Sequence, residues 1–113
     1  MEDALKEARF SGVETVDGVI YARSNPVYPE FTAIPEGQGW RLAFAWPVRA
    51  TEAQMQAWTT LHPEAPMDIC QGETRITLLV PPASLPDWAG LVQEMVATCT
   101  GWRRITRQRD EGM

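Results

Sequence analysis

The sequence predicts an α+β domain in which helices cover one face of an antiparallel sheet, because a strand–helix pattern occurs in it twice. An apolar strand that ends in proline is found at 41–47 and again at 75–81. Each strand is followed by a helix-capping residue, Thr51 or Ser84, and then by apolar residues at helical spacing. The chain has 113 residues, of which 44% are hydrophobic and 22% charged, so a single domain over 1–113 is expected.

The first part of the chain, 1–38, is expected to add a hairpin and a loop to this domain. Residues 2–9 have a weak helical pattern with few apolar positions. Asp17-Gly18 lies between two β-branched runs and is typical of a two-residue hairpin turn, because both turn positions require positive φ. The strands on either side of this turn are predicted at 12–16 and 19–23.

A long loop is expected at 24–39, which contains three prolines and two glycines. Those residues argue against a long helix and against a central strand. Loops of this length are usually functional or mobile. Its side chains Tyr28 and Phe31 are therefore candidate contact residues.

Residues 40–46 alternate between large apolar side chains and the smaller or charged residues Arg41, Ala43 and Ala45, which predicts a strand with one buried face. Thr51 and Gln54 then match a capping box, and a helix is expected over 51–62, where His62-Pro63 ends it.

The second unit contains a hairpin that turns near Gln71-Gly72, between strands at 67–70 and 74–80. Apolar residues at helical spacing predict a helix over 84–99, which Gly101 is expected to stop. A last strand is expected at 102–107.

This element order predicts a ferredoxin-like βαββαβ core over 39–108, with the N-terminal hairpin as an addition. Right-handed crossovers place both helices on one sheet face, and the strands 40–46 and 74–80 take the central positions. Cys70 and Cys99 then lie too far apart for a disulfide bond.

An alternative order, α-β-β-β-α-β-β-α, counts the weak first helix and lets the last helix continue past Gly101. This order and the acidity of the chain resemble the small acidic chaperones of type III secretion, with no shared motif. The resemblance implies a homodimer that binds extended segments of client proteins. Gly101 and the arginines that follow it favour the strand instead.

The sheet face away from the helices is predicted to have small and partly apolar side chains in its middle. An exposed patch of this kind usually marks an interface. Either the N-terminal segment or a second copy of the chain is expected to cover it. The predicted contact residues are this face, the loop residues Tyr28 and Phe31, and a basic C-terminal end. In full they are Arg41, Ala43, Ala45, Arg75, Thr77, Leu79, Tyr28, Phe31, Arg103, Arg104 and Arg107.

The composition argues against several classes of function. A net charge of −5 and the absence of aromatic residues on the open face argue against nucleic-acid binding. No apolar run is long enough to span a membrane, and the acidic start is unlike a secretory signal, so a cytoplasmic location is expected. The cysteines, serines and glycines match no metal, nucleophile or phosphate motif, so no cofactor is expected. His62 is expected to act structurally at a helix C-terminus.

The sequence therefore predicts a non-enzymatic protein-binding or adaptor module that forms a homodimer. A client-binding chaperone and a small acidic inhibitor encoded by a mobile element are special cases of this prediction. The alternative is a small-molecule-binding domain or a small enzyme, which fold analogy alone supports.

Overall fold

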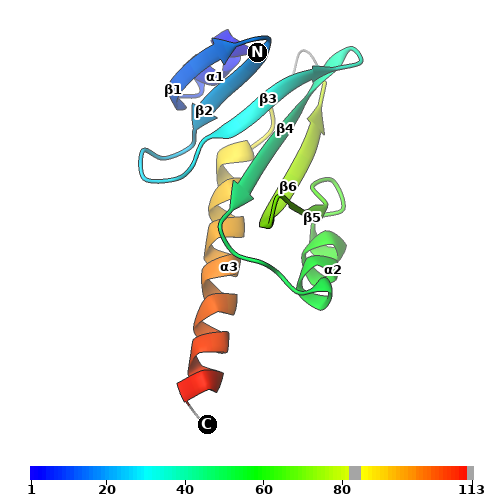
Figure 1. Ribbon diagram of the computed structural model, residues 1–113. Coiled ribbons are helices and arrows are strands. Elements are labelled where there is room, and N and C mark those ends of the chain that lie inside the picture. Colours follow the sequence, from blue (N-terminus) through cyan, green and yellow to red (C-terminus); the bar gives the residue numbers. More distant parts are fainter. Residues whose placement is uncertain (82–84, 112–113) are drawn as a thin grey trace.

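Figure 1 shows the computed structural model, which describes residues 1–81 and 85–111, with side chains described as far as Trp102. The fold is α+β, with six strands in one antiparallel sheet of order β1-β2-β3-β4-β6-β5. The elements in chain order are α1 Glu2–Glu7, β1 Ser11–Val16, β2 Val19–Arg23, β3 Phe31–Glu36, β4 Gly39–Trp46, α2 Glu52–Leu61, β5 Met67–Cys70, β6 Glu73–Val80 and α3 Trp88–Glu111.

The hydrophobic core lies between one face of the sheet and the helices. Alternate residues of the inner strands point into it, and Phe31 is packed edge-to-face between Phe10 and Trp88, with ring centroids 5.1 and 5.7 Å away. Aromatic pairs in this geometry add to the stabilisation from burial alone. The largest fully buried side chains are Trp88, Phe31, Phe44, Leu5, Leu42, Ile76, Met95 and Val92.

Both predicted hairpin turns are confirmed. Asp17 and Gly18 have φ values of 52° and 81°, and Gln71 and Gly72 have 53° and 82°. Positive φ at both central residues matches the right-handed twist of the flanking strands, and it fixes their register.

No central strand was predicted in 24–39, and this prediction is wrong, because β3 lies between β2 and β4. Pro35 fits because it faces Trp40 next to the closing pair of a two-residue turn, where its nitrogen points away from β4. The Pro35 nitrogen points toward β2, but no residue of β2 pairs with it, since the last β2–β3 pair is Ile20 with Ala33. The missing N–H therefore breaks no ladder bond, and β3 gains the burial of its apolar side chains.

The predicted capping box of α2 is confirmed. The Thr51 hydroxyl accepts a hydrogen bond from the Gln54 backbone N–H, and the Gln54 side chain accepts one from the Thr51 N–H. These bonds satisfy two donors that the first helical turn leaves free.

The strand predicted at 102–107 is wrong, and so is the βαββαβ order that requires it, because α3 continues to Glu111. Trp88, Met95 and Cys99 are fully buried at helical spacing, and Trp102 extends the same stripe across Gly101. A glycine inside a helix costs about 1 kcal/mol, which is less than the burial of a tryptophan contributes.

The start of this helix also differs from the prediction. It begins at Trp88, and the Asp87 carboxylate accepts a hydrogen bond from the Gly90 N–H over 3.0 Å. The predicted cap, Ser84, lies outside the described residues.

The sheet keeps part of the predicted arrangement. β4 and β6 are neighbours, with β5 beyond β6, as the paired units predict. The position beside β4, which a βαββαβ sheet gives to its last strand, is occupied by β3 instead. The observed element order also contains one strand more than the alternative α-β-β-β-α-β-β-α order.

Candidate functional site

The sheet face opposite the helices is open in the part of the chain that the structure describes. Strands β1 to β3 extend the sheet sideways and do not fold over this face (Figure 1). We call it the open sheet face. Of its predicted residues, Leu79 is 66% exposed and Arg41 is exposed, while Ala43, Ala45, Arg75 and Thr77 are half-buried.

The middle of the open sheet face has no charged side chain on the four inner strands. The strand register places Tyr21 beside Thr32, Thr32 beside Ala43, and Ala43 beside Thr77. These four residues form a row across β2, β3, β4 and β6, which we call the middle row. Tyr21 places an aromatic residue on the open sheet face, so the predicted absence of aromatic residues there is wrong. All four are half-buried, so their side chains keep surface that a partner can cover.

Ion pairs flank the middle row on both sides. On one side, Arg75 makes two hydrogen bonds to the Asp68 carboxylate, of 3.0 and 2.6 Å. These bonds raise the pKa of the Arg75 guanidinium above its ordinary value. On the other side, Arg41 lies 3.5 Å from the Glu36 carboxylate.

An apolar row lies beside the Arg41 pair. The register places Val16 beside Val19 and Ile34 beside Arg41, which faces Leu79 on the next strand. Val16 is 45% exposed. The open sheet face thus has an uncharged middle and, on one side of it, apolar side chains next to the Arg41–Glu36 ion pair.

Neither of the two predicted loop residues lies on this face. Phe31 is 1% exposed and belongs to the core, on the opposite side of the sheet. Tyr28 is half-buried and packs edge-to-face on Trp46, with ring centroids 5.9 Å apart. Arg103, Arg104 and Arg107 fall on the helical backbone of α3, and their side chains lie outside the described residues.

His62 joins α2 to α3, which the sequence did not predict. Its ring packs on Trp58 at 4.3 Å, and its two nitrogens lie 3.4 Å from Glu64 and 3.1 Å from Glu94. Only Glu64 is close in sequence, so the contact with Glu94 follows from the packing of the two helices. The expected structural role of His62 agrees with this geometry.

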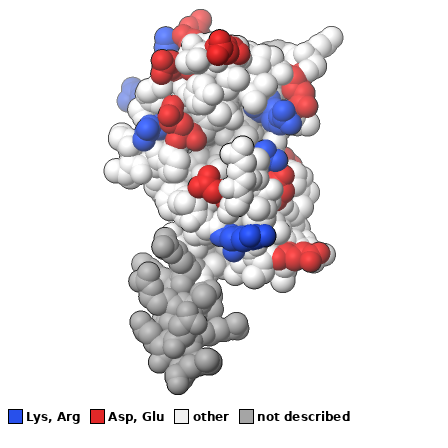
Figure 2. All heavy atoms as spheres, viewed as in Figure 1, with Lys and Arg blue, Asp and Glu red and all other residues white. Residues whose placement is uncertain are grey.

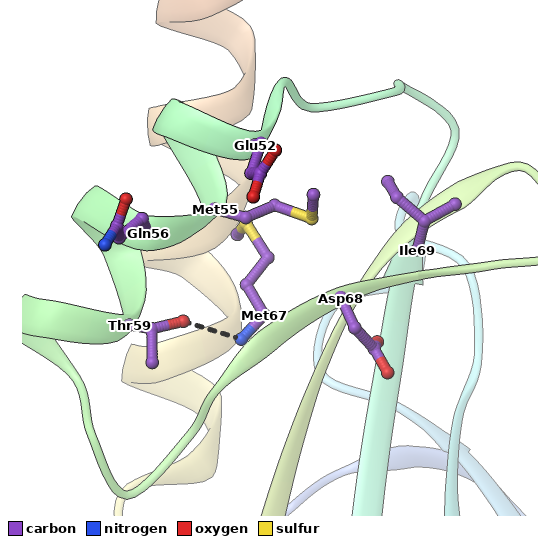
Figure 3. A pocket seen from close by; sticks show the side chains of 7 residues that line it. All are labelled: Glu52, Met55, Gln56, Thr59, Met67, Asp68 and Ile69. Atoms are coloured by element: carbon purple, nitrogen blue, oxygen red, sulfur yellow. Dashed lines mark hydrogen bonds between the residues drawn. The ribbon is translucent and has the colours of Figure 1, made fainter.

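A recess that the sequence did not indicate lies between α2 and the edge strand β5 (Figure 3). We call it the α2–β5 groove. Its volume is about 470 Å³, and a hydrogen bond of 3.1 Å from the Met67 backbone N–H to the Thr59 hydroxyl crosses one end of it. Its lining residues are Glu52, Met55, Gln56, Thr59, Met67, Asp68 and Ile69.

Acidic and basic side chains are interspersed on the side of the molecule that Figure 2 shows. Among the described residues, no group of three or more His, Cys, Asp or Glu side chains is placed to hold a metal ion. Within the same residues, no helix has the length and apolarity to cross a membrane. No protein-family model, curated protein or solved structure matches the chain.

Proposed function

We propose that this chain is a non-enzymatic protein-binding module that pairs with a second copy of itself through the open sheet face. The observation that carries the proposal is the uncharged middle row between flanking ion pairs. Protein interfaces have this composition, since charged residues are depleted at their centres and retained at their rims. On a face that stays solvated, charged side chains would be expected along the middle as well as at the edges.

The size of the face supports the proposal. Six strands about 4.8 Å apart, with central strands of eight residues, give a face of roughly 600 Å². One partner in an interface of standard size buries about 800 Å². Protruding side chains make the accessible area larger than this flat outline. One face therefore supplies most of the area that each partner needs in a stable contact between identical surfaces.

The free thiols support the cytoplasmic location that belongs to the same proposal. Cys70 and Cys99 are both unpaired, and Cys99 is fully buried. Proteins in oxidising compartments commonly use such cysteines in disulfides, whereas reducing compartments keep them free.

Sedimentation equilibrium of the chain and two variants tests the self-association. Ala43→Glu places a charge in the middle row, and Ala57→Glu makes the same change at an exposed position of α2 on the other side of the sheet. We expect the wild type and Ala57→Glu to dimerise and Ala43→Glu to be monomeric with an unchanged circular dichroism spectrum. A wild type that stays monomeric at millimolar concentration would contradict the proposal.

A further inference from the structure

We infer that two copies of the chain pair with their strands aligned, about a twofold axis that runs along the strands between β3 and β4. In this arrangement β6 of one copy lies over β2 of the other, and Leu79 packs against Val19 of the other copy. This arrangement rests on the proposed self-association through the open sheet face, and it specifies which residues of the two copies meet.

Two identical sheet faces can be packed with aligned strands about either of two twofold axes. An axis along the strands reverses the order of the strands and places each row of side chains over the same row of the other copy. An axis along the middle row keeps the order of the strands and places the apolar row over the row that contains Arg75. The chemistry and the size of the side chains in each row therefore distinguish the two arrangements.

The apolar row favours the axis along the strands. Val19, Ile34 and Leu79 lie in this row on β2, β3 and β6. An axis along the strands packs these side chains on one another, so the contact removes their exposed apolar surface from water. Leu79 is 66% exposed, so it has a large apolar surface to bury.

The charged row on the other side of the middle row argues against the second axis. In this row Arg75 is hydrogen-bonded to Asp68, and Arg23 on β2 is also ion-paired, 3.9 Å from a glutamate. An axis along the middle row would place Leu79 over Arg75 of the other copy. That contact would take an ion pair out of water and bring no new partner to it, which is unfavourable. An axis along the strands instead places the ion pairs of the two copies over one another, at a polar rim.

The sizes of the side chains in the middle row favour the same axis. An axis along the strands places Tyr21 over Thr77 of the other copy, and Thr32 over Ala43, so each contact joins a larger side chain with a smaller one. An axis along the middle row would place tyrosine over tyrosine and alanine over alanine. The two tyrosines would then hold the sheets apart above the alanines and leave a gap, which close packing disfavours.

The order of the strands gives the position of the axis. β3 and β4 are the third and fourth of the six strands. With the axis between them, each strand of one copy lies over a strand of the other, which gives the largest contact area.

The charges close to this axis are also complementary. Arg41 on β4 and Glu36 on β3 lie 3.5 Å apart, next to the turn that joins these strands. With the axis between β3 and β4, the two Arg41–Glu36 pairs of the dimer alternate in sign around it. The charges at this edge of the interface therefore attract one another between the copies.

Complementary charges introduced into the full chain test this arrangement. Val19→Lys and Leu79→Glu each place a charge against an apolar residue of the other copy, so we expect each variant alone to be monomeric. In an equimolar mixture, the introduced lysine of one chain faces the introduced glutamate of the other, and the second contact keeps its wild-type side chains. We expect a heterodimer about tenfold or more tighter than the self-association of either variant. Native mass spectrometry measures this, because the heterodimer and the two homodimers differ in mass.

A mixture of Val19→Lys and Leu79→Lys is the control, because like charges meet in it and we expect no heterodimer. Circular dichroism shows whether each variant keeps the wild-type fold. In a dimeric wild type, isotope-filtered NMR needs no variant to fold, and we expect contacts between the methyl groups of Leu79 and those of Val19 in the other copy. The absence of these contacts would contradict the arrangement.

The outcomes separate the arrangement from the self-association on which it rests. A dimeric wild type whose variant mixture stays monomeric would overturn the arrangement and leave the self-association intact. A Leu79→Glu variant that dimerises as tightly as the wild type would also overturn it, because a glutamate over Arg75 is what the axis along the middle row predicts. A wild type that stays monomeric at millimolar concentration would contradict both.

Discussion

Thr74 is the fully buried polar residue that ties the start of β6 to the connection before α2, and its replacement by valine is predicted to destabilise the fold by about 2–4 kcal/mol. Its hydroxyl donates to the Val48 carbonyl over 2.8 Å and accepts from the Ala50 N–H over 2.9 Å. Valine has nearly the same shape, so Thr74→Val removes both bonds without opening a cavity.

The magnitude follows from what each partner keeps. The Val48 carbonyl still accepts from the Thr74 backbone N–H over 2.9 Å, so its loss is one ordinary hydrogen bond of about 1 kcal/mol. The Ala50 N–H, on a residue that is 6% exposed, is left with no acceptor, which costs about 1–3 kcal/mol. The whole stability of a small domain is about 5–15 kcal/mol, so the change is large.

Thr74→Ser is the matched control, because serine keeps the hydroxyl and loses only a methyl group, at a cost of about 1 kcal/mol. Urea unfolding followed by circular dichroism and tryptophan fluorescence measures both variants. We expect the order wild type, serine, valine, from most to least stable. If the valine variant is as stable as the serine variant, packing rather than hydrogen bonding holds this connection, and the reasoning is refuted.

Three further substitutions or titrations test the fold. Gly101→Ala should raise the free energy of unfolding by up to about 1 kcal/mol, because alanine is favoured inside a helix and its Cβ meets nothing within 4 Å; a lower urea midpoint would contradict this. Gly39→Ala should destabilise the protein, because the new Cβ would overlap the carbonyl oxygen of Val80; an unchanged melting temperature would refute that contact. Burial raises the pKa of the Cys99 thiol to about 11, so the folded state holds this proton more tightly than the unfolded state. Its contribution to stability should therefore be constant below about pH 8.5 and fall as the pH rises toward 11, compared with Cys99→Ala. If the two proteins lose stability in parallel, the thiol is not buried.

Features set by local chemistry could be predicted from the sequence. Asp17-Gly18 and Gln71-Gly72 take the positive φ that a two-residue hairpin turn requires at both positions, and Thr51 satisfies free donors of its own helix. The two turns, the helix cap and the strand register could therefore be predicted from these residues without knowledge of the rest of the fold.

The incorrect predictions involve residues whose local preference was overridden by packing. Pro35 is tolerated in β3 because β2 ends before it, and that depends on the length of another strand. Gly101 lies inside a helix because Trp102 is packed against the core. Neither fact is visible within a short window of sequence.

The candidate sites follow the same division. Alternation along β4 and β6 identified Ala43 and Thr77 as outward-facing residues. Their neighbours Tyr21 and Thr32 were missed because the N-terminal strands were not expected to extend this sheet. The α2–β5 groove was missed because it depends on how closely a helix approaches an edge strand, which periodicity does not report.

The most direct test of the account is an isotope-filtered NMR experiment on an equimolar mixture of labelled and unlabelled chains. It detects proton contacts only between different copies. If the open sheet face is the self-association surface, the methyl groups of Ala43 and Thr77 will show contacts to the other copy. Intermolecular contacts confined to other surfaces, or none at millimolar concentration, would contradict the account.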